Sequence, residues 1–533
     1  MTQHARAIPS ASQRHPATAA LTTPAIAVVM VTWNRTAEAR RAIESVLSQH
    51  GIDLGTVHLV VIDNASTDGT TQALTRWLSP ERTIVNETAR AHEPVFATTA
   101  TDKTNSAGLA SVTLVRNMEN LGGTGGFNTG FQVVERVLAT HTNIDFLWLL
   151  DDDAEADHNA LASLLATADG DPNAGLIGSR AVDIADRRTT YETTIYYDQH
   201  RGRMGETPHA GHRLEADHRA WVEGVGDTRG DRAFTGVREV DVVSACSMLA
   251  RWSVVRGVGY WDSRYFIYCD DADWCLRVGR AGHRVVCDLD AVVYHTPWFR
   301  KLTPTRRYYA ERNAIWTMRK GLSGRALRRS TAEWMRSILR ESLAAGLRRR
   351  RFQAEILRRT ALDAATNHQG KLDHTEPPHE ELESAINRLG LNRPDAHIVV
   401  LCCTPEQHEL AGSILAQLQD GHGQPSITVI SRDGSGPGDI IYHPSMRSRL
   451  SSQSKLLLRP PDACIVFDSH NDFPLLRCPP TIHIDRRTPD QCQIERDGIR
   501  GRLAFFARWT ATAFRATWYC LRSPKQQPKA PFG

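Results

Sequence analysis

Short apolar runs alternate with amphipathic segments near the start of the chain. Residues 25–32 are almost wholly apolar, 35–49 carry apolar side chains at helical spacing, 57–62 are apolar again, and 70–78 are again amphipathic. Uninterrupted apolar runs of this length are typical of strands that are buried on both faces. This β-α-β-α order predicts an α/β fold in which helices wind around a parallel sheet.

Polar side chains follow three of the predicted strands. Thr32 and Asn34 come at the end of the first strand, Asp63 ends the second, and Asp151 follows the apolar run 146–150. In wound sheets of this kind, ligands bind at the carboxyl ends of the strands. We therefore expect these four side chains to lie along one edge of the sheet.

Asp151 is the first of three consecutive aspartates. Three adjacent carboxylates repel one another unless a cation neutralises them, which indicates a divalent metal that grips a diphosphate. The alternative is an acidic turn that caps a helix beginning near Ala154, since acidic residues favour helix starts. A cap needs only one carboxylate, so the triplet favours the metal site.

A second acidic cluster lies about 120 residues later, at residues 270–273, after another apolar run. Asp271 suits a general base aimed at the same centre, although it could instead form a salt bridge with Arg277 on a following helix. His295 ends a further apolar strand. A lone histidine is more often structural than a ligand, but its position at a strand end favours metal ligation.

Residues 120–128 contain four glycines between a predicted strand and a helix that we expect from about Gly130. Glycines let the backbone approach a ligand closely and expose amides at a helix start. The segment is neither a Walker sequence nor a dinucleotide fingerprint, so by itself it fits several kinds of nucleotide loop.

The remaining chain predicts a helical extension and a second α/β domain. Residues 86–110 and 199–235 are polar and predict long loops that could cover an acceptor site. We divide the chain into a disordered tail (1–24), a first α/β domain (25–320), an Arg-rich helical extension (321–373), a linker (374–395), a second, smaller α/β domain (396–500) and an amphipathic helix with a tail (501–533). The second α/β domain shows no catalytic motif.

Charge is unevenly distributed along this chain of 533 residues, whose net charge is only +4. Residues 300–359 contain 18 Lys or Arg against 4 Glu and no Asp. Such a basic block suggests an anionic partner: a membrane surface, a lipid-linked diphosphate or nucleic acid. We expect no membrane span and no signal peptide, and the ten scattered cysteines fit reduced thiols in a cytosolic protein.

Residues 501–521 predict an aromatic-rich, basic helix. Arg508, Arg515 and Arg522 recur every seven residues and therefore share one helical face. Such a helix can lie in a membrane interface, or it can pack on its own domain with its arginines outward. Both alternatives remain open from the sequence.

Together these segments resemble the family 2 glycosyltransferases of the GT-A fold over residues 25–370. The shared features are Val-Thr-Trp-Asn-Arg (31–35), Val-Ile-Asp-Asn-Ala-Ser-Thr-Asp-Gly-Thr (61–70), the Asn-Leu-Gly-Gly loop, the aspartate triplet, residues 266–274, Arg277, Gly282, His295 and Tyr-Ala-Glu-Arg-Asn (309–313). The glycine-rich loop and the Trp-Leu-Leu-Asp-Asp-Asp run look most like the bacterial galactofuranosyltransferase branch. Rhamnosyltransferases share most of this pattern, and the C-terminal region matches neither branch.

The resemblance implies a GT-A type mixed sheet and a role for each matched residue. Asp151, Asp153 and His295 would hold Mn2+ or Mg2+, and Asp271 would be the base that removes the acceptor proton. The residues implied to bind the nucleotide and donor sugar are Thr32, Asn34, Asp63, Asn120, Gly123, Gly126, Asn128 and Asp152.

We therefore predict an inverting, metal-dependent glycosyltransferase that uses UDP-galactofuranose. It would act on a lipid-linked or cell-envelope glycan, as a peripheral protein at the cytoplasmic face of the membrane, so the basic block would meet anionic lipid rather than nucleic acid. One alternative is a dTDP-rhamnose-dependent transferase. A nucleotidyltransferase would show a basic glycine-rich loop at the first strand, which residues 31–35 lack. A non-catalytic protein of glycan assembly would tolerate the loss of Asp271.

Overall fold

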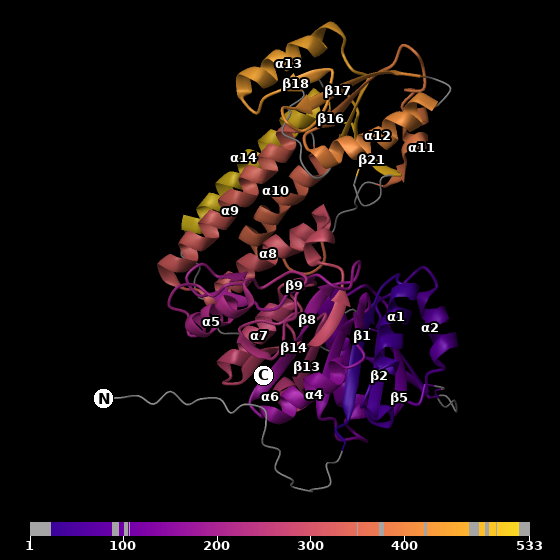
Figure 1. The fold of residues 1–533 in the computed structure, drawn as a ribbon, viewed down its shortest axis with the longest axis vertical. Coiled ribbons are helices and arrows are strands. Elements are labelled where there is room, and N and C mark those ends of the chain that lie inside the picture. The colour runs from indigo at the N-terminus through magenta and orange to yellow at the C-terminus, as the bar shows by residue number, and fades with distance from the viewer. Residues whose placement is uncertain are drawn as a thin grey trace.

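The described residues contain two large β-sheets, joined by a layer of long helices, and one two-stranded sheet (Figure 1). This computed structural model describes residues 23–521, apart from 88–94, 101–104, 106, 349, 373–377, 421–423, 468–478, 485–489 and 497. The predicted N-terminal tail, part of the 86–110 loop, and Arg522 with the residues after it lie outside the described residues.

The larger sheet has twelve strands in the order β12-β14-β8-β13-β6-β1-β2-β5-β3-β4, with β7 paired to β14 and β9 paired to β8. Its strands are β1 Ile26–Thr32, β2 Val57–Asp63, β3 Arg82–Asn86, β4 Phe96–Ala100, β5 Ser111–Asn117, β6 Phe146–Asp151, β7 Ala154–Ala156, β8 Ala174–Asp183, β9 Thr190–Glu192, β12 Val237–Val240, β13 Ser247–Arg251 and β14 Arg284–His295. β1 lies between β2 and β6, parallel to both, whereas β13 is antiparallel to β6. The predicted α/β fold with a wound, mixed sheet is confirmed.

Helices cover both faces of this sheet. They are α1 Thr36–Leu47, α2 Thr70–Leu78, α3 Gly122–Val133, α4 Ala160–Gly170, α6 Trp252–Val258 and α7 Asp270–Arg280. One apolar core joins α1, α2 and α4 to the sheet, and another joins α3, α6 and α7 to the opposite face. Central strands are therefore buried on both faces, which explains their unbroken apolar sequences.

The glycine-rich segment is a buried helix rather than the predicted loop before a helix. α3 begins at Gly122, and the glycines let it lie directly on β1. A Cβ on Gly126 would come within 2.4 Å of Val31 Cγ1, and one on Gly130 within 2.3 Å of Val29 Cγ1. Local propensity predicted a loop here because glycine disfavours helices, but close packing on the sheet overrides that preference.

Two further segments differ from the sequence-based expectation. Residues 154–156 form β7 rather than a helix, so the acidic triplet is not a helix cap. The 199–235 segment is not a plain loop, because it contains β11 (Arg203–Gly205), which pairs with β10 (Tyr196–Asp198), and α5 (Glu215–Val225).

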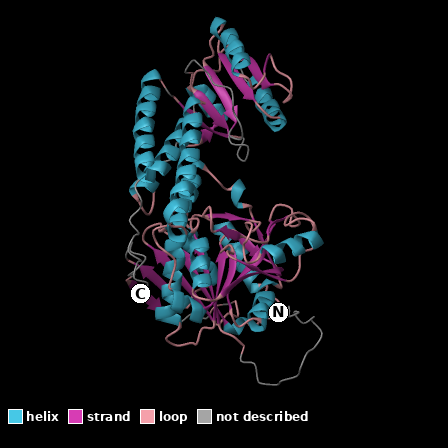
Figure 2. Cartoon of the chain, turned by 90° about the vertical axis from the view of Figure 1, so that its left-hand side faces the viewer, coloured by secondary structure: helices cyan, strands magenta, loops and turns pink. Residues whose placement is uncertain are grey.

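The helical layer consists of α8 Pro304–Gly321, α9 Gly324–Leu347, α10 Arg351–Thr366 and α14 Ile499–Leu521. Figure 2 shows these long helices standing between the two sheets. Several arginines of the basic block form internal ion pairs: Arg307 pairs with Glu311 and Glu341, and Arg358 pairs with Glu355. The block is therefore partly an internal network rather than a uniformly exposed patch.

The smaller sheet has the order β15-β21-β20-β19-β16-β17-β18. Its strands are β15 Glu380–Glu381, β16 His397–Cys402, β17 Ser426–Arg432, β18 Ile440–Tyr442, β19 Ala463–Phe467, β20 Thr481–Ile484 and β21 Gln491–Glu495, and its helices are α11 Leu382–Arg388, α12 Pro405–Asp420 and α13 Met446–Leu458. This sheet confirms the predicted second α/β unit. β15 and α11 lie in the segment that we treated as a linker.

Two expectations about the chain can be compared with the described residues. None of the described helices is long and apolar enough to cross a membrane. The nine described cysteines are free thiols.

The packing of α3 on β1 predicts opposite outcomes for two glycine substitutions. Gly126→Ala should lower the free energy of unfolding by about 1–3 kcal/mol, because the new methyl group would overlap Val31. Gly123→Ala is the matched control: its Cβ would lie 3.8 Å from Ile267 Cγ1, and alanine is the better helix former. Chemical denaturation of both variants measures the difference, and equal effects would contradict the packing role of Gly126.

Candidate active site

Four of the predicted site residues end strands along one edge of the larger sheet. Thr32, Asp63, Asp151 and His295 are the last residues of β1, β2, β6 and β14. These strands all run in the same direction, because β14 is parallel to β8, and β8 and β6 are both antiparallel to β13. The sequence-based expectation of a shared edge is therefore correct.

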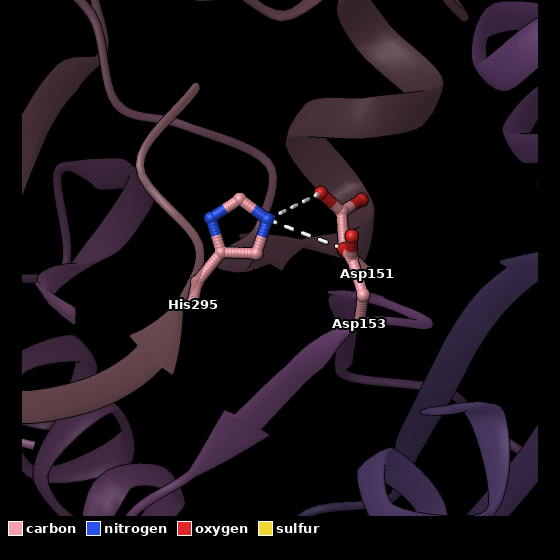
Figure 3. A group of neighbouring side chains, drawn as sticks. All are labelled: Asp151, Asp153 and His295. Carbon is pink, nitrogen blue, oxygen red and sulfur yellow. Dashed lines mark ion pairs between the residues drawn. The ribbon is translucent and has the colours of Figure 1, made fainter. Parts of the chain in front are cut away.

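Asp151, Asp153 and His295 form a cluster that could hold a metal ion (Figure 3). One ligand atom from each lies within 4.8 Å of the others. His295 Nε2 is 3.2 Å from Asp153 Oδ1 and 3.8 Å from Asp151 Oδ2. The pairing of β7 with β14 sets Ala154 opposite His295, which brings the histidine beside the aspartate triplet.

Hydrogen bonds on both ring nitrogens orient His295. The Tyr191 hydroxyl lies 2.8 Å from Nδ1, and Lys301 Nζ lies 2.6 Å from Nε2. Because the lysine ammonium only donates, Nε2 accepts and the Nδ1 hydrogen is donated to Tyr191. A histidine that binds metal through one nitrogen commonly donates its other N–H in this way.

The cluster also accepts a positive charge from within the chain. Lys301 Nζ is 2.9 Å from Asp153 Oδ2 and 2.6 Å from His295 Nε2, so its positive charge lies against the cluster. Burial raises the pKa of Asp153, but the neighbouring His295 and the charge of Lys301 outweigh this and hold it well below its usual range. Two carboxylates and an imidazole are suitable ligands for Mn2+ or Mg2+, so these residues fit the predicted metal.

Asp152 shares the partner Arg35 with Asp153. Arg35 Nη1 lies 3.0 Å from Asp152 Oδ1 and 2.7 Å from Asp153 Oδ2, and so joins the start of α1 to the triplet. Burial raises the pKa of Asp152 to about 7, although Arg35 opposes the shift. Arg35 belongs to the shared 31–35 motif, but we assigned it no role from the sequence.

The three aspartates in the first turn of α7 have different surroundings. Asp270 accepts a hydrogen bond of 2.5 Å from the Thr124 hydroxyl, and Asp273 pairs with Arg277 and Lys320. Asp271 accepts hydrogen bonds from the backbone amides of Ala272 and Ala245, at 2.7 and 3.4 Å. The alternative salt bridge between Asp271 and Arg277 is therefore wrong, because Arg277 is paired with Asp273.

The electrostatic environment of Asp271 suits a general base. Burial raises its pKa to about 6, the two backbone amides lower it, and the charges of Glu192 and Asp151 raise it further. A base is most effective when its pKa lies near the working pH. Asp271 is thus a carboxylate close enough to the metal cluster for the charge of Asp151 to act on it.

A strained segment positions α7. Phe266, Tyr268 and Cys269, directly before the helix, have φ angles of 69°, 68° and 62°, in the left-handed region. Side chains other than glycine rarely adopt this conformation, and when they do they often mark functional sites. Because this backbone conformation is unfavourable by itself, contacts from other parts of the chain must stabilise it.

Asn313 of α8 supplies much of that support. Its amide nitrogen lies within 2.8–3.0 Å of the carbonyl oxygens of Tyr265, Ile267 and Tyr268. The buried Arg312 guanidinium also donates to Tyr265, at 3.1 Å. Both residues belong to the 309–313 motif that we quoted for the resemblance, but the sequence did not reveal what they hold.

The glycine-rich helix contacts the same strained segment. A Cβ on Gly122 would lie 2.1 Å from the Phe266 carbonyl oxygen, so only glycine fits. The Thr124 amide donates to that oxygen at 3.1 Å, and its hydroxyl donates to Asp270. The two motifs are therefore interlocked, although they lie far apart in the sequence.

The residues implied to bind the nucleotide and donor have varied contacts. Asn34 Oδ1 accepts from the Thr67 amide at 2.8 Å, and Asp63 accepts from the Thr71 hydroxyl. Thr32 is buried at the strand end beside them. Asn120 caps the start of α3 by accepting from the Gly122 amide at 2.9 Å.

Two members of that set have packing contacts in the structure. The Asn128 side chain donates to the Trp261 carbonyl at 2.9 Å and accepts from its amide at 3.0 Å. Gly126 lies against Val31, as described above. Their implied contact with the donor stays a prediction.

The structure adds two residues from β9 to the site. Tyr191 orients His295, and the charge of Glu192 raises the pKa of Asp271. Burial raises the pKa of Glu192 itself to about 7. No motif marked these residues in the sequence, because β9 reaches the site only through its pairing with β8.

A buried chain of asparagines was also missed. Asn86 donates to Asn117 at 2.8 Å, Asn117 donates to Asn64 at 3.0 Å, and Asn64 donates to the Gly122 carbonyl at 2.9 Å. These side chains tie the ends of β3, β5 and β2 to the start of α3. The only sign of this chain in the sequence was that each of the three asparagines lies at or directly after the end of a strand.

Comparison with known proteins identifies the catalytic unit. The family model described as glycosyltransferase like family 2 matches residues 24–318, which is more than half of the chain. The chain belongs to that family. Its larger sheet with flanking helices agrees with the GT-A fold that the sequence resemblance implied. No curated protein matches the sequence.

Similar solved structures include GalNAc-T7 with UDP, GalNAc and Mn2+. It matches at 13% identity and a TM-score of 0.38, covering 56% of this chain and 48% of that one. TarS of S. aureus matches at 11% identity and a TM-score of 0.37, covering 64% and 49%. The mannosyltransferase PcManGT of Pyrobaculum calidifontis, in complex with GDP-Man and Mn2+, matches at 16% identity and a TM-score of 0.35, covering 69% and 80%. The chain thus spans about half the length of the first two.

The contact between Tyr191 and His295 predicts a specific defect in metal use. Tyr191→Phe removes the hydroxyl oxygen that accepts the Nδ1 hydrogen of His295. The Mn2+ concentration for half-maximal activity should therefore rise about 10- to 100-fold. Tyr294→Phe is the matched control, because its hydroxyl contacts Asp157 instead of His295. Metal titration of donor turnover measures the effect, and equal curves for the two variants would contradict the role of Tyr191.

Proposed function

We propose that the protein transfers galactofuranose from UDP-galactofuranose, with inversion, to a lipid-linked or cell-envelope glycan. The observation that supports the reaction type is that Asp271 accepts from the Ala245 amide, next to Cys246, whose carbonyl accepts from the Asp151 amide. The choice of sugar is supported by the sequence resemblance of residues 120–128 and 148–153 to the galactofuranosyltransferase branch.

In this mechanism Asp271 takes the proton of the acceptor hydroxyl as the acceptor oxygen attacks the anomeric carbon. The bond to the diphosphate breaks on the opposite face, so a single displacement inverts the configuration. Mn2+ or Mg2+ held by Asp151, Asp153 and His295 would offset the charge that develops on the leaving diphosphate. Buried Arg312 and Asn313 act indirectly, by holding the segment that carries Asp271.

Glu192 acts on the base Asp271 through its charge. When Glu192 is ionised, its charge raises the pKa of Asp271, and a higher pKa makes that carboxylate a stronger proton acceptor. Asp271 nevertheless remains ionised at neutral pH, since its pKa is about 6. The site therefore combines a usable base with a cation-binding cluster.

A donor panel tests the proposal. Purified protein with Mn2+ is incubated with UDP-galactofuranose or dTDP-rhamnose and a set of lipid-diphosphate glycan acceptors. Release of UDP with transfer of the furanose supports the proposal. Turnover of dTDP-rhamnose alone would keep the mechanism but assign the rhamnosyl branch, and binding without turnover of any donor would favour a non-catalytic role.

Loss of the base should reduce turnover without loss of donor binding. Asp271→Asn should lower kcat about 10²- to 10⁴-fold, which is the usual contribution of a positioned base. Asp169→Asn, on the exposed face of α4, is the matched control and should keep full activity. Nucleotide affinity measured by calorimetry should stay unchanged in both, and full activity of Asp271→Asn would exclude it as the base.

The raised pKa of Asp271 predicts the pH profile. Because the base must be deprotonated, kcat/KM at saturating metal should be constant above about pH 7 and fall tenfold per pH unit well below pH 6. Asp271→Asn should lose this acidic limb. A limb that persists unchanged in the variant would assign the titration to another group.

A further inference from the structure

α14 packs into the helical layer through one face only. Phe505, Thr512 and Ala516 are buried on that face, and the Trp509 indole N–H donates to the Leu339 carbonyl at 3.0 Å. Phe505 also fills the space above Gly346 of α9, where a Cβ would come within 2.4 Å of its ring. The helix is therefore firmly seated against α9 and α10.

The opposite face of α14 is apolar and exposed. Leu503, Phe514 and Trp518 are 65%, 73% and 51% accessible to solvent. At about 100° per residue, Leu503, Ala507, Phe514 and Trp518 fall within a narrow arc directly opposite the buried residues. We call these four residues the outer stripe. A helix packed on a water-soluble domain normally has its most polar side chains there.

The charge around the outer stripe is mostly positive, although Glu355 of α10 pairs with Arg508 at 2.8 Å. α14 contains four arginines and no acidic residue. Arg508 and Arg515 are exposed beside the stripe, and α9 exposes Arg336 and Arg340 on the same helical layer. In Figure 1, α14 starts next to the smaller sheet and runs beside α9 along the edge of this layer. Nothing in α14 itself would repel an anionic surface.

We propose that the outer stripe of α14 inserts into the interface of an anionic lipid bilayer. Apolar and aromatic side chains would enter the headgroup region, while the flanking arginines bind lipid phosphates. Both sequence-based alternatives for this helix then hold together, because one face packs on the protein and the other binds lipid. The inference deepens the proposed function, since a lipid-linked acceptor would be presented at the same surface.

Vesicle binding by the full chain tests this surface. Sedimentation is compared with vesicles of phosphatidylcholine alone and with vesicles that also contain phosphatidylglycerol. The test variant is Phe514→Ser with Trp518→Ser, and the matched control is Val237→Ser, an exposed apolar residue on β12. All substituted side chains are exposed, so an unchanged thermal midpoint confirms that each variant is folded.

We expect wild type and Val237→Ser to bind the anionic vesicles, and the double variant to bind them about 100-fold more weakly or worse, at about tenfold per buried aromatic side chain. Higher salt should weaken the wild-type binding. Equal binding by the double variant would overturn the inference. It would also be overturned if light scattering showed a wild-type dimer that the double variant dissociates, because a second copy would then cover the stripe.

A second readout separates this inference from the proposed function. Hydrolysis of UDP-galactofuranose without an acceptor depends on the catalytic edge, the candidate site around Asp151, Asp153 and His295. Its rate should be equal in wild type and the double variant. Vesicle binding that needs the stripe, without turnover of that donor, would support the lipid surface and reject the proposed sugar. Turnover of the donor by a protein that ignores anionic vesicles would reject the lipid surface alone.

Discussion

The catalytic edge depends on a backbone segment that would not hold its conformation alone. Residues 266, 268 and 269 adopt left-handed φ angles, each of which costs about 1–2 kcal/mol for a residue with a side chain. The Asn313 amide and Gly122 compensate from two distant parts of the chain, one by hydrogen bonds and one by leaving space. Asp271 is therefore placed by α8 and α3 as much as by its own helix.

A second constraint is the concentration of negative charge at the same edge. The aspartate triplet, Asp270, Asp271 and Glu192 come together from three separate regions, and burial raises the pKa of several of them. Arg35 and Lys301 offset part of this repulsion. The edge is thus suited to a cation and to a base whose protonation changes near neutral pH.

The helical layer links this edge to the rest of the molecule. α8 supports the strained segment with Asn313, α9 and α10 pack behind it, and α14 returns from the second α/β unit to complete the layer. Much of the basic block is used in this layer, as ion pairs and as the buried Arg312. One continuous body therefore connects the catalytic edge to the exposed face of α14.

The sequence by itself determined the wound sheet, the second α/β unit, and the candidate metal ligands Asp151 and His295 at strand ends and Asp153 in the turn after Asp151. These features depend on local periodicity and on strand direction, which one segment reveals without the others. Only the tertiary structure decided that the glycine segment is a helix and that Tyr191, Glu192 and Asn313 belong to the site. Those facts depend on contacts between segments far apart in the chain, and neither spacing nor composition encodes such contacts locally.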